Sequence, residues 1–168
     1  MRKFRLFTIL MMAVVCVNLM ATNAKSSTSD MCILLVAKSE VNGQDISQIS
    51  KEKNHSLAIY ADGDNICLSS CFRATKEQSY GQLHLSKIET NFDEGGEYFN
   101  YFLIWEYKNT YDSNKGTAVV TLILQDKYVT VIIVSEDGRF KATYQTVIVE
   151  GDIQSLLSKC QKVKHTSN

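Results

Sequence analysis

Residues 98–149, YFNYFLIWEYKNTYDSNKGTAVVTLILQDKYVTVIIVSEDGRFKATYQTVIV, decide the fold of this chain. Four segments within or just beyond this stretch carry the strand signal, NYFLIWEYK, TAVVTLILQ, KYVTVIIVS and RFKATYQTVIVE. Successive side chains of a strand point to opposite faces, so an inward face shows a period of two. β-branched and aromatic residues, which suit a pleated surface, dominate all four segments. The stretch therefore predicts four consecutive β-strands.

The first of these segments has the most distinctive face. Its alternate positions are large and mostly aromatic: Phe99, Tyr101, Leu103, Trp105 and Tyr107. The third segment is β-branched almost throughout from Val129 to Val134, which is typical of a strand covered on both faces.

The connections between these segments are short. Asp126-Lys127 can form a tight reversal, and Ser135-Glu136-Asp137-Gly138 carries an Asp-Gly turn signal. Parallel neighbours need a crossover of a dozen residues or more, so short links indicate antiparallel pairing. We expect a mainly β fold, an antiparallel meander that forms a barrel or a strongly curved sheet. The alternative is a two-layer α+β roll.

A helix is expected directly after the meander, over 152–163. Gly151 ends the last strand, and Asp152 can cap the first turn of a helix. One apolar stripe follows at helical spacing: Ile153, Leu156, Leu157, Cys160 and Val163. Such a stripe predicts a single C-terminal helix packed on the sheet.

Upstream of residue 98 the strand signals are shorter. Met31–Ala37, His55–Ala61, Ile66–Phe72 and Gln82–Thr90 are candidate strands. Asp62-Gly63-Asp64-Asn65 predicts a turn between the second and the third. Leu83 and Leu85 are in phase but Ile88 is not, which a β-bulge near Ser86 would explain.

The N-terminus has the layout of a secretory signal peptide. Arg2, Lys3 and Arg5 precede an apolar run, and a more polar segment ends at Ala24. We expect residues 1–24 to be removed and 25–168 to form one secreted or periplasmic domain. Cleavage after Ala21, a retained membrane anchor and lipidation at Cys16 are the alternatives.

Charge argues against nucleic-acid binding. The whole chain has a net charge of 0, and removal of the three basic residues before position 24 changes it to −3. No basic patch remains that could bind phosphates.

Four cysteines remain in 25–168, and an even number in an exported chain favours disulfides. Cys32 with Cys160, and Cys67 with Cys71, is the expected pairing among three possible ones. A zinc site formed with His55 is the less favoured interpretation.

The aromatic face is the candidate binding surface. Tyr101, Trp105, Tyr107, Tyr128 and Tyr144 could contact an apolar or carbohydrate ligand. The alternative is that these rings simply fill the core between the sheet and the helix. A barrel of this strand number can hold one small ligand.

No catalytic residues, metal site or cofactor are expected. The chain has no Gly-x-Ser-x-Gly elbow, phosphate-binding loop or metal-protease motif, and the acidic stretch from Asp93 to Glu97 lacks calcium-loop spacing. We expect a non-catalytic binding or interaction module of the cell envelope or exterior, with a small ligand or an envelope protein as its partner. A small hydrolase with a dispersed site, or a structural subunit of an envelope assembly, is the alternative.

Overall fold

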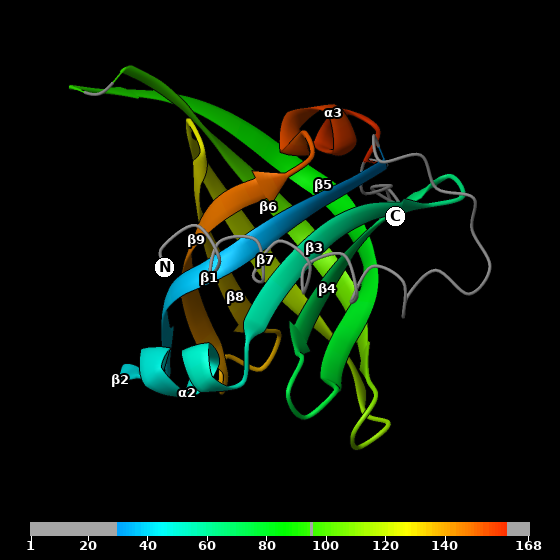
Figure 1. Cartoon of the computed structure of the whole chain (residues 1–168). Coiled ribbons are helices and arrows are strands. Elements are labelled where there is room, and N and C mark those ends of the chain that lie inside the picture. The colour runs from blue at the N-terminus through cyan, green and yellow to red at the C-terminus, as the bar shows by residue number, and fades with distance from the viewer. Residues whose placement is uncertain (1–29, 95, 161–168) are drawn as a thin grey trace.

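The computed structural model describes residues 30–94 and 96–160 (Figure 1). Within these residues two short helices, α2 (Ser47–Glu52) and α3 (Ile153–Ser158), accompany one antiparallel sheet. Its strands are β1 (Met31–Val41), β2 (Gln44–Asp45), β3 (His55–Asp62), β4 (Asn65–Phe72), β5 (Glu77–Asp93), β6 (Gly96–Asn109), β7 (Lys115–Gln125), β8 (Tyr128–Ser135) and β9 (Lys141–Glu150).

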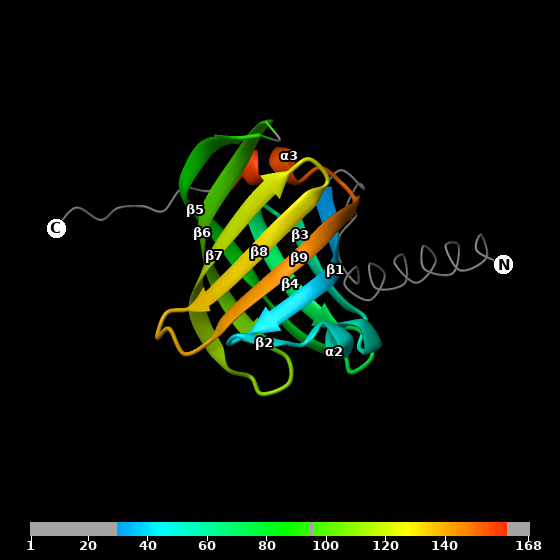
Figure 2. The same ribbon diagram turned by 90° about the vertical axis from the view of Figure 1, so that its left-hand side faces the viewer.

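The sheet closes on itself. The strand order is β2-β1-β3-β4-β5-β6-β7-β8-β9, and β1 also pairs with β9 along most of its length. All the strands except β2 form the ring, and they cross it at a tilt that Figure 2 shows clearly. The predicted meander, barrel and C-terminal helix are therefore confirmed, and the two-layer roll is not formed. Closure pairs the edges that an open meander would leave exposed.

Two irregularities interrupt the pairing of β1 with β9. The register shifts between Ile33 and Leu34, where Val149 of β9 is the extra residue, and again between Val36 and Lys38, where Ala37 of β1 is the extra residue. Extra residues at such points bend a strand and increase its twist. The second shift also keeps both Val36 and Ser39 on the inner side, because each is more buried than the residue after it.

The bulge expected near Ser86 is present. Leu85 pairs with Leu103, but the next pair is Lys87 with Phe102, so Ser86 has no opposite residue on β6. Beyond the bulge, β5 and β6 continue as a long hairpin that extends past the barrel rim (Figure 1).

The predicted turns form where glycine and its neighbours allow a positive φ. Gly63 has φ +59° between β3 and β4, and Asp126 has φ +53° between β7 and β8. Between β8 and β9 the amide of Gly138 donates to the carbonyl of Ser135 at 2.8 Å.

Helix α3 lies across one end of the barrel, and α2 lies at the other (Figures 1 and 2). As predicted, Asp152 caps α3, because its Oδ1 accepts from the amides of Gln154 and Ser155 at 3.0 and 3.1 Å. The helix ends at Ser158 and is shorter than the 152–163 we expected. The amides of Lys159 and Cys160 bond to carbonyls three residues back, which tightens the last turn and ends the α-helix.

The barrel interior differs between its two ends. The α3 end is filled by aliphatic side chains, among them Leu57, Leu103, Leu122 and the helix residues Leu156 and Leu157, all fully buried. Burying a side chain of this kind stabilises the fold by about 1.5–3 kcal/mol. The α2 end carries rings instead, and they do not fill it.

The expected signal peptide, residues 1–24, and Val163 at the end of the predicted helix lie outside the described residues. Across residues 30–94 and 96–160, neither helix has the length and apolar character that crossing a membrane requires.

Candidate functional site: a cavity at the α2 end of the barrel

A cavity of about 350 Å³ lies inside the barrel at the end that bears α2. Drug-sized ligands occupy pockets of about 300–1,000 Å³, so this volume suits a small organic molecule. Six rings dominate the lining: Phe72, Trp105, Tyr107, Tyr111, Phe140 and Tyr144. The other lining residues are Val41, Ile46, Ser70, Glu77, Gln78, Ser79, Asn109, Ala118, Ile133 and Ser135.

The alternation of β6 places Trp105 and Tyr107 in this wall. Both point inward, and their ring centroids lie 5.0 Å apart. Tyr107 faces Gly116 on β7, and a Cβ at Gly116 would lie 2.7 Å from the Tyr107 hydroxyl. Because Gly116 has no side chain, the Tyr107 ring can lie directly over it.

His55 lies directly behind the cavity wall. Its ring stacks on Phe72 at 4.1 Å and meets Tyr144 edge-on at 4.9 Å. Its Nε2 is 2.9 Å from the Ser70 hydroxyl, whereas its Nδ1 is buried without a hydrogen-bond partner. Burial lowers the pKa of His55 to about 4, so the imidazole is neutral at physiological pH.

His55 was not among the residues predicted to bind a ligand. It lies two residues before Leu57, on the same face of β3 as Leu57, Ile59 and Ala61. Because alternate residues of a strand share one face, the pattern that places Leu57 and Ile59 inward also places His55 inward.

Trp105, one of the lining residues, carries an unpaired polar atom. The residue is 3 % exposed, and its indole Nε1 is buried without a hydrogen-bond partner. A buried N–H that is left unpaired costs about 1–3 kcal/mol, so such groups are rare unless a ligand or a water completes them.

The lining carries little charge. Among the described lining residues Glu77 is the one carboxylate, and no lysine, arginine or histidine is present. Glu77 accepts a hydrogen bond from Thr75 and lies 3.6 Å from the ammonium of Lys53, and these contacts lower its pKa.

Three of the five candidate ligand-binding residues, Trp105, Tyr107 and Tyr144, border the cavity together. Tyr101 does not, because it lies further along β6 toward α3 and is 8 % exposed within the core there. Tyr128 is 55 % exposed at the start of β8, where the ammonium of Lys127 lies 5.7 Å from its ring centroid. Phe72, Tyr111 and Phe140 belong to the lining but were not in the candidate set.

The expected disulfides are absent from the part of the chain that the structure describes. Cys67 and Cys71 lie on the same strand, β4, where four residues span about 13 Å, well beyond the Cα separation of about 7 Å that a disulfide tolerates. Cys160 and Cys32 are both free, and the Cys160 Sγ contacts the Leu83 carbonyl on β5 at 3.2 Å. Burial raises the pKa of Cys32 to about 12 and those of Cys67 and Cys160 to about 11.

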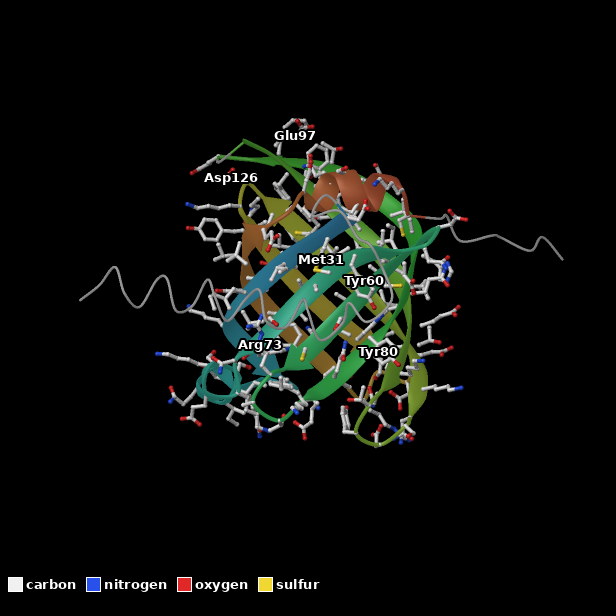
Figure 3. All side chains as sticks on the ribbon, turned by 45° about the vertical axis from the view of Figure 1, so that its right-hand side comes forward. Met31, Tyr60, Arg73, Tyr80, Glu97 and Asp126 are labelled. Carbon is white, nitrogen blue, oxygen red and sulfur yellow. The ribbon has the colours of Figure 1, made fainter. Side chains whose placement is uncertain are left out.

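Other polar groups do not form a comparable site. His84 lies between the buried Leu83 and Leu85 on β5 and faces outward, and its Nε2 lies 3.6 Å from Glu106. A second cavity, of about 330 Å³, lies beside α3 between Glu97, Asp126 and Asp152 (Figure 3 labels the first two at the α3 end). Asp152 is the cap of α3, and within residues 30–94 and 96–160 no three His, Cys, Asp or Glu side chains are arranged to hold a metal ion.

Comparison with protein-family models, with curated proteins and with solved structures finds no match to this chain.

Proposed function

We propose that this protein is a non-catalytic binding module of the cell envelope or exterior that takes one small, largely apolar molecule into its barrel. The cavity at the α2 end carries the proposal. It is enclosed by a closed sheet, has six rings in its lining and lies away from the helix that fills the other end. The signal-peptide pattern of residues 1–24 supports a location outside the cytoplasm.

Two features of the interior favour binding over a purely structural role. First, the aliphatic residues and α3 already close the opposite end, so the rings at the α2 end are not needed to seal the core. Second, the ring strands pair on both sides within the barrel, so the long edge that a strand-adding partner requires is confined to β5 from His84 to Asp93, in the hairpin beyond the rim.

A titration with prodan, a neutral fluorescent naphthalene that carries one ketone, tests the proposal. Wild-type protein should bind one prodan per chain with a saturable rise in emission. Ala118→Leu puts extra volume into the cavity and should weaken binding at least tenfold. The matched control is Val119→Leu, which changes the next residue on the outer face, 43 % exposed, and should leave binding unchanged.

Thermal melting of both variants shows whether each is folded. Should Ala118→Leu fail to fold, Val41→Phe narrows the same cavity from the half-buried end of β1. Absence of saturable prodan binding by the wild type, or equal binding by the cavity variant and its control, would refute the proposal.

A hydrolase is the second candidate, and one contact favours it. Ser70 lines the cavity and its hydroxyl lies 2.9 Å from His55 Nε2, the spacing of a nucleophile and its base. The rest of the arrangement is unfavourable, because His55 Nδ1 has no carboxylate to orient the ring and its low pKa makes it a poor base.

A fluorescent fluorophosphonate separates the two candidates. It labels an activated serine covalently, and labelling that is lost in Ser70→Ala but kept in Ser79→Ala would establish the hydrolase. The binding module predicts no labelling of either serine.

A further inference from the structure

We propose that the ligand is a neutral molecule that presents one hydrogen-bond acceptor, such as a carbonyl oxygen, to the indole N–H of Trp105. This inference rests on the proposed function, because it assigns a ligand class to the same cavity. Three properties of the lining lead to this inference. Most of its polar groups are already hydrogen-bonded, the indole N–H of Trp105 is not, and its charged residue is a carboxylate.

Most polar groups around the cavity are paired with protein atoms. The Ser79 hydroxyl donates to Asn109 at 2.7 Å, and the Ser70 hydroxyl contacts His55 at 2.9 Å. The Ser135 hydroxyl donates to Asp137 at 2.6 Å. A carbohydrate presents several hydroxyls that each need a partner, and in this lining the serine hydroxyls are already paired, which favours a ligand with fewer polar groups than a sugar.

Trp105 is the exception. Among the described lining residues, its Nε1 is the one buried polar atom with no hydrogen-bond partner. An indole N–H donates and cannot accept, so the group that completes it must be an acceptor. A tyrosine hydroxyl can either donate or accept a hydrogen bond, so those of Tyr107, Tyr111 and Tyr144 do not favour a ligand acceptor over a ligand donor.

The charge of the lining favours a neutral ligand. An anion inside the cavity would have no cationic lining residue among those described, and it would share the cavity with the Glu77 carboxylate. A cation would lose its hydration for a single carboxylate that Thr75 and Lys53 already contact. Burial of an unpaired charge is costly in either case.

Three probes and two variants test the assignment. Prodan carries the ketone, its parent dimethylaminonaphthalene lacks it, and anilinonaphthalene sulfonate is an anion. Trp105→Phe keeps a ring but removes the N–H. The control is Phe102→Leu, which changes a ring on the outward face of the same strand. Wild-type protein should bind prodan most tightly and the sulfonate most weakly.

Trp105→Phe should weaken prodan binding about fivefold, which is the size of one neutral hydrogen bond, and change binding of the parent less than twofold. Phe102→Leu should change neither. If Trp105→Phe weakens the binding of prodan and of its parent equally, or weakens neither, the assigned ligand class is wrong and the proposed function still stands. Failure of the wild type to bind any probe would overturn both.

A second readout does not depend on a variant. The ketone stretch of prodan bound to wild-type protein should lie at lower frequency than in a solvent that cannot donate a hydrogen bond. A bound ketone whose frequency matches that solvent would overturn the assignment.

Discussion

The imidazole of His55 stacks on the ring of Phe72 at 4.1 Å, with its Nδ1 buried and unpaired. An ionised imidazole at this place would lack both water and a negative partner. The cavity wall is therefore built around a histidine that the fold keeps neutral.

This burial predicts a pH dependence of stability. The pKa of His55 is about 4 in the folded protein and 6.5 in the unfolded chain. Between these values the unfolded chain binds the proton and the folded protein does not, so stability falls as pH decreases from 6.5 to 4. The shift corresponds to about 3 kcal/mol as an order of magnitude. In urea unfolding, the loss of unfolding free energy between pH 6.5 and pH 4 should be smaller for His55→Gln than for the wild type. An equal difference would contradict the account.

Gly116→Ala should alter the cavity at little cost in stability. The new Cβ would lie 2.7 Å from the Tyr107 hydroxyl, and the ring, being the end of a flexible side chain, can move aside. We expect unfolding free energy to change by no more than about 1 kcal/mol while prodan binding weakens severalfold. Lys115→Ala, at the exposed neighbouring residue, is the control. Unchanged prodan affinity in Gly116→Ala would show that Tyr107 does not border the bound ligand.

Gly81→Ala should be far more damaging, because a Cβ at this position of β5 would lie 1.8 Å from the backbone carbonyl oxygen of Glu106. Backbone cannot turn aside as a side chain does, so we expect a loss of about 2–4 kcal/mol in urea unfolding. The comparison is Gly63→Ala, where the space is open and a positive φ costs about 1–2 kcal/mol. A Gly81→Ala variant as stable as Gly63→Ala would mean that β5 and β6 are further apart than the structure shows.

The cysteines should behave as buried thiols. Because burial raises the pKa values of Cys67 and Cys160 to about 11, little thiolate exists at pH 8. A thiol reagent should label these two positions slowly in native protein and rapidly in guanidinium chloride, without added reductant. Slow labelling in both conditions would indicate that they are joined in a disulfide.

The sequence predicted the barrel well because its evidence is periodic. Alternation along β6 placed Trp105 and Tyr107 on one face, and the phase change after Leu85 located the bulge at Ser86. Closure itself depends on contacts between β1 and β9, which are distant in sequence and carry no local signal.

The site was predicted only in part, for the same reason. Trp105, Tyr107 and Tyr144 share an inward face with Tyr101, but depth along the barrel separates Tyr101 from the cavity, and a strand pattern does not report depth. Phe140 is in phase with Tyr144 but precedes β9, Phe72 is the last residue of β4, and Tyr111 belongs to a loop. A strand pattern does not show which end of a strand borders a cavity, so these three rings were not among the predicted ligand-binding residues. The disulfide prediction failed because it counted cysteines without testing whether Cys67 and Cys71 share a strand.

The central claim is that the α2 end of the barrel holds a ligand, and Trp105 reports on it directly. It is the single tryptophan of the chain and it lines the cavity. Titration with bromonaphthalene, whose heavy atom quenches indole emission on contact, should quench Trp105 saturably with one molecule per chain. Quenching that rises only linearly with concentration, as collisions in solution produce, would contradict the account.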